Sequence, residues 1–301
     1  MTRMTSFIDV QRRFHDLTEK ELEDTELLLS WSEYEIGSSV GWSDLLNDDR
    51  VVLLAEAGAG KTMEMVEQAN RLVGEGRFAF FVPLESLDRE PIADLLSVAD
   101  EERFEAWKAE SREAAWFFLD AVDELKLTEG KLDRALHRLS KAIDGRGDRA
   151  RVIISCRPGD WRSHLDLATV QDRLPVPARR RENPSRPPEE VFMEALRHDL
   201  GETARVAPEE EGLPNRGAVR TVAMLPMSDK QIRLFAERSG VDDSAALLAE
   251  LDRQKAWTFA RRPLDLADLI ATWTSSRRLG TRARQHEANV AVKLKDGRSR
   301  P

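Results

Sequence analysis

A run of small residues in the first quarter of the chain ends in a lysine and a threonine. Gly58 and Gly60 lie within it, Lys61 and Thr62 close it, and the apolar residues 51–54 precede it. Glycines let backbone N–H groups turn inward, lysine supplies a mobile positive charge, and a threonine hydroxyl can bind Mg²⁺. The pattern therefore predicts a strand, a phosphate-binding loop and a helix. The residues predicted to hold the phosphates are Ala57, Gly58, Ala59, Gly60, Lys61, Thr62 and Met63, and Thr62 is also predicted to hold the metal.

One position of this loop departs from the usual G-x-x-x-x-G-K-[ST] pattern, because Ala55 stands where the first glycine is expected. Alanine is a mild change there if its φ is negative, and a costly one only if the turn requires a positive φ. The alternative interpretation of the whole stretch is a glycine-rich loop that happens to precede a helix and end in Lys-Thr.

Carboxylates follow the apolar residues 115–119, at the point where a second strand is expected to end. Asp120 comes first, and Asp123 and Glu124 lie a few residues on. In an open α/β sheet, ligands bind at the carboxyl ends of the strands, so Asp120 is predicted to hold Mg²⁺ opposite Thr62. Asp123 or Glu124, with Glu124 favoured, is placed to deprotonate an attacking water. The alternative for this acidic pair is that it caps the next element.

An arginine follows a further apolar run, residues 150–156. Arg157 is expected at the same edge of the sheet as Lys61 and Asp120, where it could sense or stabilise a γ-phosphate. It could instead make a structural ion pair, and the phosphate role is the favoured interpretation.

These side chains must be positioned by a parallel sheet, and the sequence contains the strands to build one. Apolar runs at 51–54, 78–82, 115–119, 150–156 and 218–225 alternate with segments of helical periodicity. We therefore expect an α/β fold with a parallel sheet in a three-layer sandwich over residues 46–227, with a basic, proline-rich insertion at about 173–190. Residues 228–301, which open with the capping box Ser228–Gln231, are expected to form a small helical domain that resembles a lid and is truncated.

The residues before the loop are expected to form an N-terminal helical arm, over residues 1–45. Phe7, Val10, Phe14 and Leu17 recur at helical spacing, and Thr18-Glu-Lys-Glu21 offers a capping box for a second short helix. Trp42 could stack on a base, but the favoured interpretation is an apolar plug that packs the arm onto the sheet.

Composition limits the classes of partner. The 301 residues carry a net charge of −9, which disfavours a dedicated nucleic-acid binder. Cys156 is the only cysteine, so an internal disulfide is excluded and a cytoplasmic location is expected. No run of about 18 apolar residues is present to span a bilayer, and no membrane partner is expected.

Four motifs stand in order: EAGAGKT at 56–62 with its upstream strand, FFLDAVDEL at 117–125, VIISCRP at 152–158 and ARRPLDL at 260–266. Together they resemble the NACHT-type P-loop NTPases of the STAND group, particularly bacterial members associated with signalling and defence. The resemblance covers residues 42–275. It implies a P-loop fold with an extra strand between the two Walker motifs, assigned to residues 78–82, and a helical domain that clamps the nucleotide.

The resemblance also assigns roles residue by residue. Lys61 and Thr62 match the Walker A pair, Asp120 the Walker B acid, Asp123 and Glu124 the acidic pair after it, and Arg157 the sensor arginine. Pro263 matches an adenine-side proline, although Arg261 replaces the glycine of that Gly-x-Pro motif.

The expected function is an ATP-binding switch that uses Mg²⁺ and hydrolyses ATP slowly, acting in signal transduction or antiviral defence with a protein partner or with copies of itself. The alternative is a scaffold that binds ATP or ADP to hold its shape, with no turnover required. A small-molecule kinase is disfavoured because the one arginine-rich loop, 179–181, has no partner motif. GTP specificity is disfavoured because no Asn-Lys-x-Asp follows the core strands.

Overall fold

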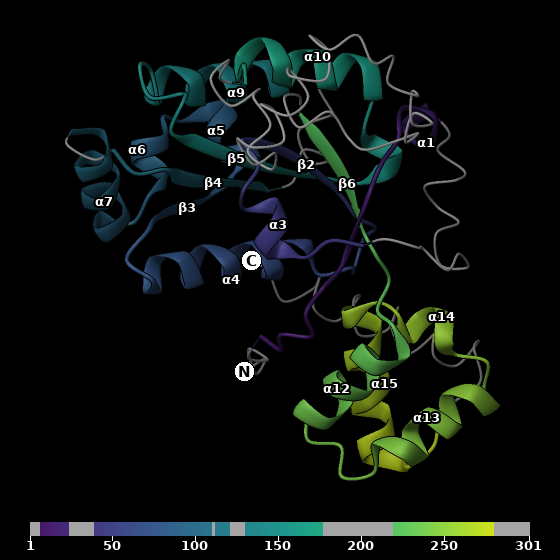
Figure 1. Ribbon diagram of the computed structural model, residues 1–301. Helices are drawn as coiled ribbons and strands as arrows, with labels where there is room; N and C mark the ends of the chain where they lie inside the picture. The colour runs from purple at the N-terminus through teal and green to yellow at the C-terminus, as the bar shows by residue number, and fades with distance from the viewer. Residues whose placement is uncertain (1–6, 24–38, 110–111, 121–129, 177–218, 280–301) are drawn as a thin grey trace, which may run out of the picture.

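The computed structural model describes residues 7–23, 39–109, 112–120, 130–176 and 219–279. Its centre is a six-stranded sheet in the order β1-β6-β2-β5-β4-β3, with helices on both faces (Figure 1). The strands are β1 (Phe14–Asp16), β2 (Arg50–Leu54), β3 (Phe78–Pro83), β4 (Ala115–Asp120), β5 (Ala150–Cys156) and β6 (Arg220–Met224). The prediction of a three-layer α/β fold of the P-loop type is confirmed.

Five strands run parallel, as expected, and β1 adds an antiparallel edge against β6. The strand beside β2 on the way to β4 is β5, so β5 separates the two motif-bearing strands within the sheet. Residues 78–82 lie between the two motifs in the chain, but they form β3, at the opposite edge of the sheet from β1. The strand expected at residues 78–82 is therefore present between the two motifs in the chain, whereas in the sheet the strand between them is β5, because sheet order does not follow chain order.

Side chains of alternate residues in the central strands point to opposite faces, as the period of two requires. Val51 and Leu53 pack with α4 (Lys61–Gly74) and α3 (Trp42–Leu45) in one core, whereas Val52 and Leu54 pack with the helices of the other face. That second layer contains α5 (Leu84–Arg89), α9 (Lys131–Ala142) and α10 (Ser163–Arg173) (Figure 1). The same core includes residues of α6 (Ile92–Leu95), which contacts α5 and α9, and of α7 (Val98–Ala109), which contacts β3. Because both faces of the sheet are covered by helices, nearly every residue of the central strands is buried, which explains their continuous apolar sequences.

The chain leaves the sheet at β6 and enters a group of four helices with a core of its own. They are α12 (Asp229–Arg238), α13 (Ser244–Arg253), α14 (Trp257–Ala260) and α15 (Pro263–Ser276). Ser228 and Gln231 form the predicted capping box at the start of α12. We call α12–α15 the helical group. Among the described residues, no helix is both long and apolar enough to cross a bilayer.

The predicted helix over residues 7–17 is wrong. Phe14–Asp16 is a strand whose partners are Met224, Ala223 and Val222 of β6. Three of the four apolar residues that suggested helical spacing are buried, each in a different place: Val10 in the helical group, Phe14 on the α4 face and Leu17 on the α9 face. Pairing with β6 provides hydrogen-bond partners for the backbone of residues 14–16, and this tertiary contact outweighs the local preference for a helix. The capping box of Thr18 and Glu21 is confirmed, and it opens α1 (Glu19–Glu23).

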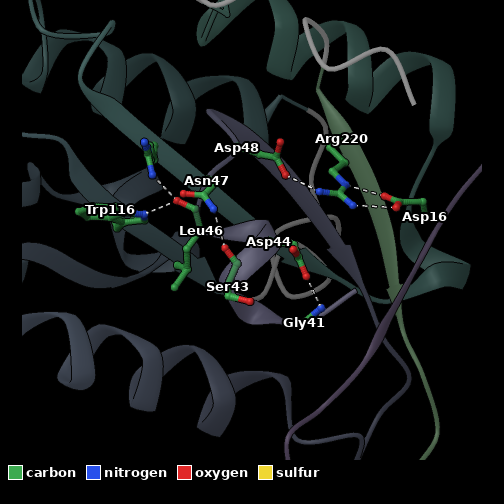
Figure 2. Close-up of polar contacts among 10 residues, drawn as sticks. Asp16, Gly41, Ser43, Asp44, Leu46, Asn47, Asp48, Trp116 and Arg220 are labelled. Atoms are coloured by element: carbon green, nitrogen blue, oxygen red, sulfur yellow. Dashed lines mark hydrogen bonds and ion pairs between the residues drawn. The ribbon is translucent and has the colours of Figure 1, made fainter. Parts of the chain in front are cut away.

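Charged and aromatic side chains connect the strands near the amino-terminal ends of β2 and β6 (Figure 2). Arg220 of β6 donates from Nε and Nη2 to both carboxylate oxygens of Asp16, at 2.5 and 2.7 Å, and from Nη1 to Asp48 at 2.6 Å. Nearby, the Leu46 carbonyl accepts hydrogen bonds from Trp116 and Arg151. These contacts fix the ends of β1, β6 and β2 opposite the edge where a ligand would bind.

Candidate functional site

The predicted phosphate-binding loop lies at the carboxyl end of β2 and runs directly into α4. Its two glycines have positive φ angles, 78° at Gly58 and 92° at Gly60, which side chains rarely allow. Gly60 is the residue before the first turn of α4, so the free N–H groups of a 14-residue helix begin at Lys61. Backbone donors and the positive end of the helix dipole therefore face the same position, which suits an anion.

Ala55 fits the loop without strain. The described non-glycine residues with positive φ are Gln11, Lys255 and Arg277, and Ala55 is not among them. Its backbone N–H donates to the Cys156 carbonyl at 3.0 Å, which continues the ladder between β2 and β5. The departure from the glycine consensus is thus of the mild kind.

Helix α4 and strands β4 and β5 bring two hydroxyls and a carboxylate together at this edge. Thr62 donates from Oγ1 to Oδ2 of Asp120 at 2.5 Å, and Ser155 of β5 donates to the other oxygen of the same carboxylate. Asp120 ends β4 and is only 6% exposed. The predicted pairing of Thr62 with Asp120 across the sheet is therefore present, and Ser155 is a contact that the sequence analysis did not assign.

These oxygen atoms fit a Mg²⁺ ion. Mg²⁺ prefers hard oxygen ligands and is usually bound by one or two protein groups together with waters and phosphate oxygens. Among the described residues, no group of three or more His, Cys, Asp or Glu side chains could form an all-protein metal cage. A shared site of hydroxyl, carboxylate and phosphate is the arrangement that the donor set supports.

Lys61 lies in the first turn of α4 with its side chain folded back on the loop. Its Nζ donates to the Ala55 carbonyl at 3.0 Å. Met63, also predicted to bind phosphate, lies in the same turn with its side chain 49% exposed. Arg157 directly follows β5 on the same edge and is exposed. Asp123 and Glu124, the predicted water-activating pair, lie outside the described residues, as does the arginine-rich loop 179–181.

The start of α15 reaches the loop from the helical group. A Cβ placed on Gly60 would lie 3.6 Å from Cγ of Pro263, and one on Gly58 would lie 3.6 Å from Leu264. The Leu264 N–H also approaches the Gly58 carbonyl, at 3.4 Å. Pro263 is thus brought to the loop, and Leu264, which the sequence analysis did not assign, touches it as well. Arg261 has a φ of −70°, so the glycine that it replaces is not required there by the backbone.

A buried polar group lies beside the loop. Arg12, only 2% exposed, donates from Nη1 to the Ala59 carbonyl at 3.1 Å. Glu64, two residues after Thr62, accepts a hydrogen bond of 2.9 Å from Nε1 of Trp42. Trp42 also packs edge-on against Phe14, so it is the predicted plug between the N-terminal segment and the sheet. Sequence reasoning gave no sign of Arg12, since it stands in a polar run.

Burial shifts the pKa values of Arg12 and Glu64 in the directions that favour their neutral forms. Desolvation lowers the pKa of Arg12 to about 10, although the charge of Glu64 opposes the shift. Desolvation raises the pKa of Glu64 to about 7, against the Trp42 hydrogen bond and the Arg12 charge. Arg12 remains cationic at neutral pH and is therefore a permanent donor to the loop.

No protein-family model matches the chain, and no curated protein matches it. Among solved structures, the chain is similar to AMPPCP-bound DnaA from Aquifex aeolicus, with 12% identity and a TM-score of 0.28. That alignment covers 95% of this chain and 96% of the other.

Proposed function

We propose that this chain binds ATP with Mg²⁺ and acts as a slowly hydrolysing nucleotide switch. The observation that carries the proposal is the contact between Thr62 at the start of α4 and Asp120 at the end of β4. It joins a helix N-terminus with positive-φ glycines to a carboxylate from a non-adjacent strand, which is the arrangement that a metal-bound triphosphate needs. ADP is the expected product and a second ligand of the same site.

Each residue has a role in this proposal. Backbone N–H groups from Ala57 to Met63 and the charge of Lys61 hold the phosphates, while Thr62 and Asp120 hold Mg²⁺ and Ser155 orients the carboxylate. Bound Mg²⁺ would neutralise charge that develops on the phosphate oxygens. Glu124, rather than Asp123, would take the proton from the attacking water, and Arg157 would stabilise the γ-phosphate. Pro263 would lie on the adenine side.

The finer proposal is a NACHT-type NTPase of the STAND group. It rests on the order of the four motifs and on the helical group that touches the loop. In this proposal residues 46–227 form the nucleotide-binding core and 228–301 the lid, with 1–45 as an N-terminal arm. The switch would act in the cytoplasm, in signalling or antiviral defence, through a protein partner or self-association.

Lysine substitution tests nucleotide binding. Lys61→Ala should weaken ATP binding by about 100-fold or more, because a charged contact to phosphate and its preorganised position are lost. Titration with a fluorescent ATP analogue in the presence of Mg²⁺ measures it. Lys230→Ala, which changes an exposed lysine of α12, is the matched control. Equal affinity in the wild type and Lys61→Ala would contradict the proposal.

A second function is favoured by the contacts that already hold the loop. The Leu264 N–H near Gly58 and the Arg12 bond to Ala59 could keep a nucleotide-locked scaffold closed without turnover. Glu124→Gln separates the two functions, with phosphate release as the measurement. The switch predicts that phosphate release falls about 100-fold or more while ATP binding is kept, because the general base is lost. A biological activity that survives Glu124→Gln but not Lys61→Ala would support the scaffold instead.

A further inference from the structure

The N-terminal segment 8–13 connects the helical group to the phosphate-binding loop, and we call it the strap. On one side it is held by α12: Arg238 donates to the Asp9 carbonyl at 2.6 Å, and Gln231 donates from Nε2 to the carbonyls of Val10 and Gln11 at 3.0 and 2.8 Å. Val10 is buried in the core of the helical group. The strap therefore moves with α12 unless these bonds break.

On the other side the strap reaches the loop through Arg12. Its guanidinium bridges two carbonyls, donating from Nη1 to Ala59 at 3.1 Å and from Nη2 to Leu225 at 2.6 Å. Leu225 directly follows β6, on the chain that leads into α12, and its own N–H donates to the Arg13 carbonyl at 2.9 Å. One buried side chain thus ties the loop, the strap and the connection to the helical group.

The backbone between the two attachments is strained. Gln11 has a φ of 55°, a left-handed conformation that is uncommon for a residue with a side chain. It stands between Val10, which is buried among the helices, and Arg12, which is buried beside the loop. Such strain persists only where the surroundings hold it, and here both neighbours are held by different parts of the molecule.

We propose that Arg12 is a positioning residue for the nucleotide site, which sets the phosphate-binding loop through the Ala59 carbonyl and couples it, by way of the strap, to helix α12. The inference deepens the proposed function and rests on it for its effect on nucleotide affinity. Its effect on the loop itself does not depend on any nucleotide. The cationic charge of Arg12 suits the role, since a charged donor bonds more strongly to a carbonyl than a neutral one.

Two substitutions break the coupling at its two ends. Arg12→Lys keeps the charge but cannot bridge both carbonyls in the fork geometry of a guanidinium. Gln231→Glu acts at a distance from the loop. It keeps an acceptor oxygen for the Ser228 N–H, as the capping box requires, but removes the Nε2 donor that holds Val10 and Gln11.

Ser228→Ala is the matched control for Gln231→Glu. It removes the hydroxyl cap of α12, which accepts from the Gln231 N–H, and leaves the two bonds from Gln231 to the strap in place. A loss that reflects only a weaker helix should therefore be as large in Ser228→Ala as in Gln231→Glu.

The first measurement is amide hydrogen exchange of the nucleotide-free chain over residues 55–62. We expect Arg12→Lys and Gln231→Glu each to speed exchange in the loop by about fivefold or more, on the scale of one lost hydrogen bond to a charged group. Ser228→Ala should leave exchange in the loop unchanged. Unchanged exchange in Arg12→Lys, or equal exchange in Gln231→Glu and Ser228→Ala, would overturn the proposal.

The second measurement is affinity for a fluorescent ATP analogue. Arg12→Lys should weaken binding by about tenfold, and the effects of Arg12→Lys and Gln231→Glu should be non-additive in the double variant, because both act through one strap. Additive effects would contradict coupling. If wild type and Lys61→Ala bind equally, the proposed function fails, while the exchange result still decides whether Arg12 positions the loop.

Discussion

At the level of single residues, the phosphate-binding loop keeps its backbone shape although Ala55 replaces the first glycine of the usual pattern. Ala55 lies in the ordinary region of backbone space and extends the ladder to β5, whereas Gly58 and Gly60 carry the positive φ angles. The loop's need for glycine is therefore confined to the two positions that turn the backbone toward the phosphates, and the first consensus glycine is dispensable in this chain.

A pair of reciprocal substitutions tests that statement. Gly60→Ala should destabilise the loop by about 1–2 kcal/mol and weaken ATP binding by about tenfold, because an alanine at φ 92° is strained. The added Cβ would meet Pro263 only at ordinary contact distance, 3.6 Å, so the backbone is the cause. Ala55→Gly should leave ATP affinity within about twofold and cost about 1 kcal/mol of stability. Binding titration and thermal unfolding measure both, and a large loss of affinity in Ala55→Gly would contradict the argument.

At the level of the helices, a buried carboxylate stabilises the helical group. Glu250 of α13 accepts hydrogen bonds from Arg253 at 2.7 and 2.6 Å, and from the Leu279 N–H, beyond α15, at 3.2 Å. The Arg253 hydrogen bonds lower the pKa of Glu250 to about 2, with burial opposing them. One carboxylate thus links α13 to the chain that leaves α15.

This carboxylate predicts a pH dependence of stability. Because its folded pKa lies below its unfolded value of 4.5, the stabilisation is complete above about pH 4.5 and is lost as pH falls toward 2. Glu250→Gln should therefore lower the free energy of unfolding by about 1 kcal/mol at neutral pH, since the Arg253 side chain is 63% exposed and screened. The difference from wild type should shrink in urea titrations at about pH 3. Asp252→Asn, on an exposed position of the same helix, is the control, and a difference independent of pH would contradict the assignment.

At the scale of the whole molecule, the N-terminal segment is joined to the sheet by Arg220 (Figure 2). Its guanidinium is mostly buried, and the hydrogen bonds that it donates to Asp16 and Asp48 raise its pKa in spite of that burial. The three residues come from β6, β1 and the turn before β2, so the network fixes the edge that carries β1.

Breaking this network should lower global stability. Arg220→Gln leaves two carboxylates without their cation and should cost about 3 kcal/mol, and Arg220→Lys, which loses the two-pronged contact to Asp16, about 2 kcal/mol. Chemical denaturation is the measurement. Arg71→Gln breaks an exposed pair with Glu75 on α4 and should cost less than about 0.5 kcal/mol. Equal losses at the two sites would show that Arg220 is no more than a surface ion pair.

Local sequence patterns were sufficient to predict the strands of the parallel sheet and the chemistry of the loop. Buried parallel strands are continuous apolar runs, and the Gly-Lys-Thr turn, the acid at Asp120 and the capping boxes are local patterns whose physics acts over a few residues. These features could be predicted because neighbouring residues alone decide them.

Contacts between segments that are distant in the chain could be identified only from the folded structure. The N-terminal segment has helical spacing of its apolar residues, yet Phe14–Asp16 form a strand. The reason is that their backbone pairs with β6 and that Val10, Phe14 and Leu17 are each buried in a different core. The place of β5 between β2 and β4, the Ser155 bond to Asp120, and Arg12 beside the loop all join residues far apart in the chain. No local pattern marks such contacts, because their free energy is gained only when the sheet has formed.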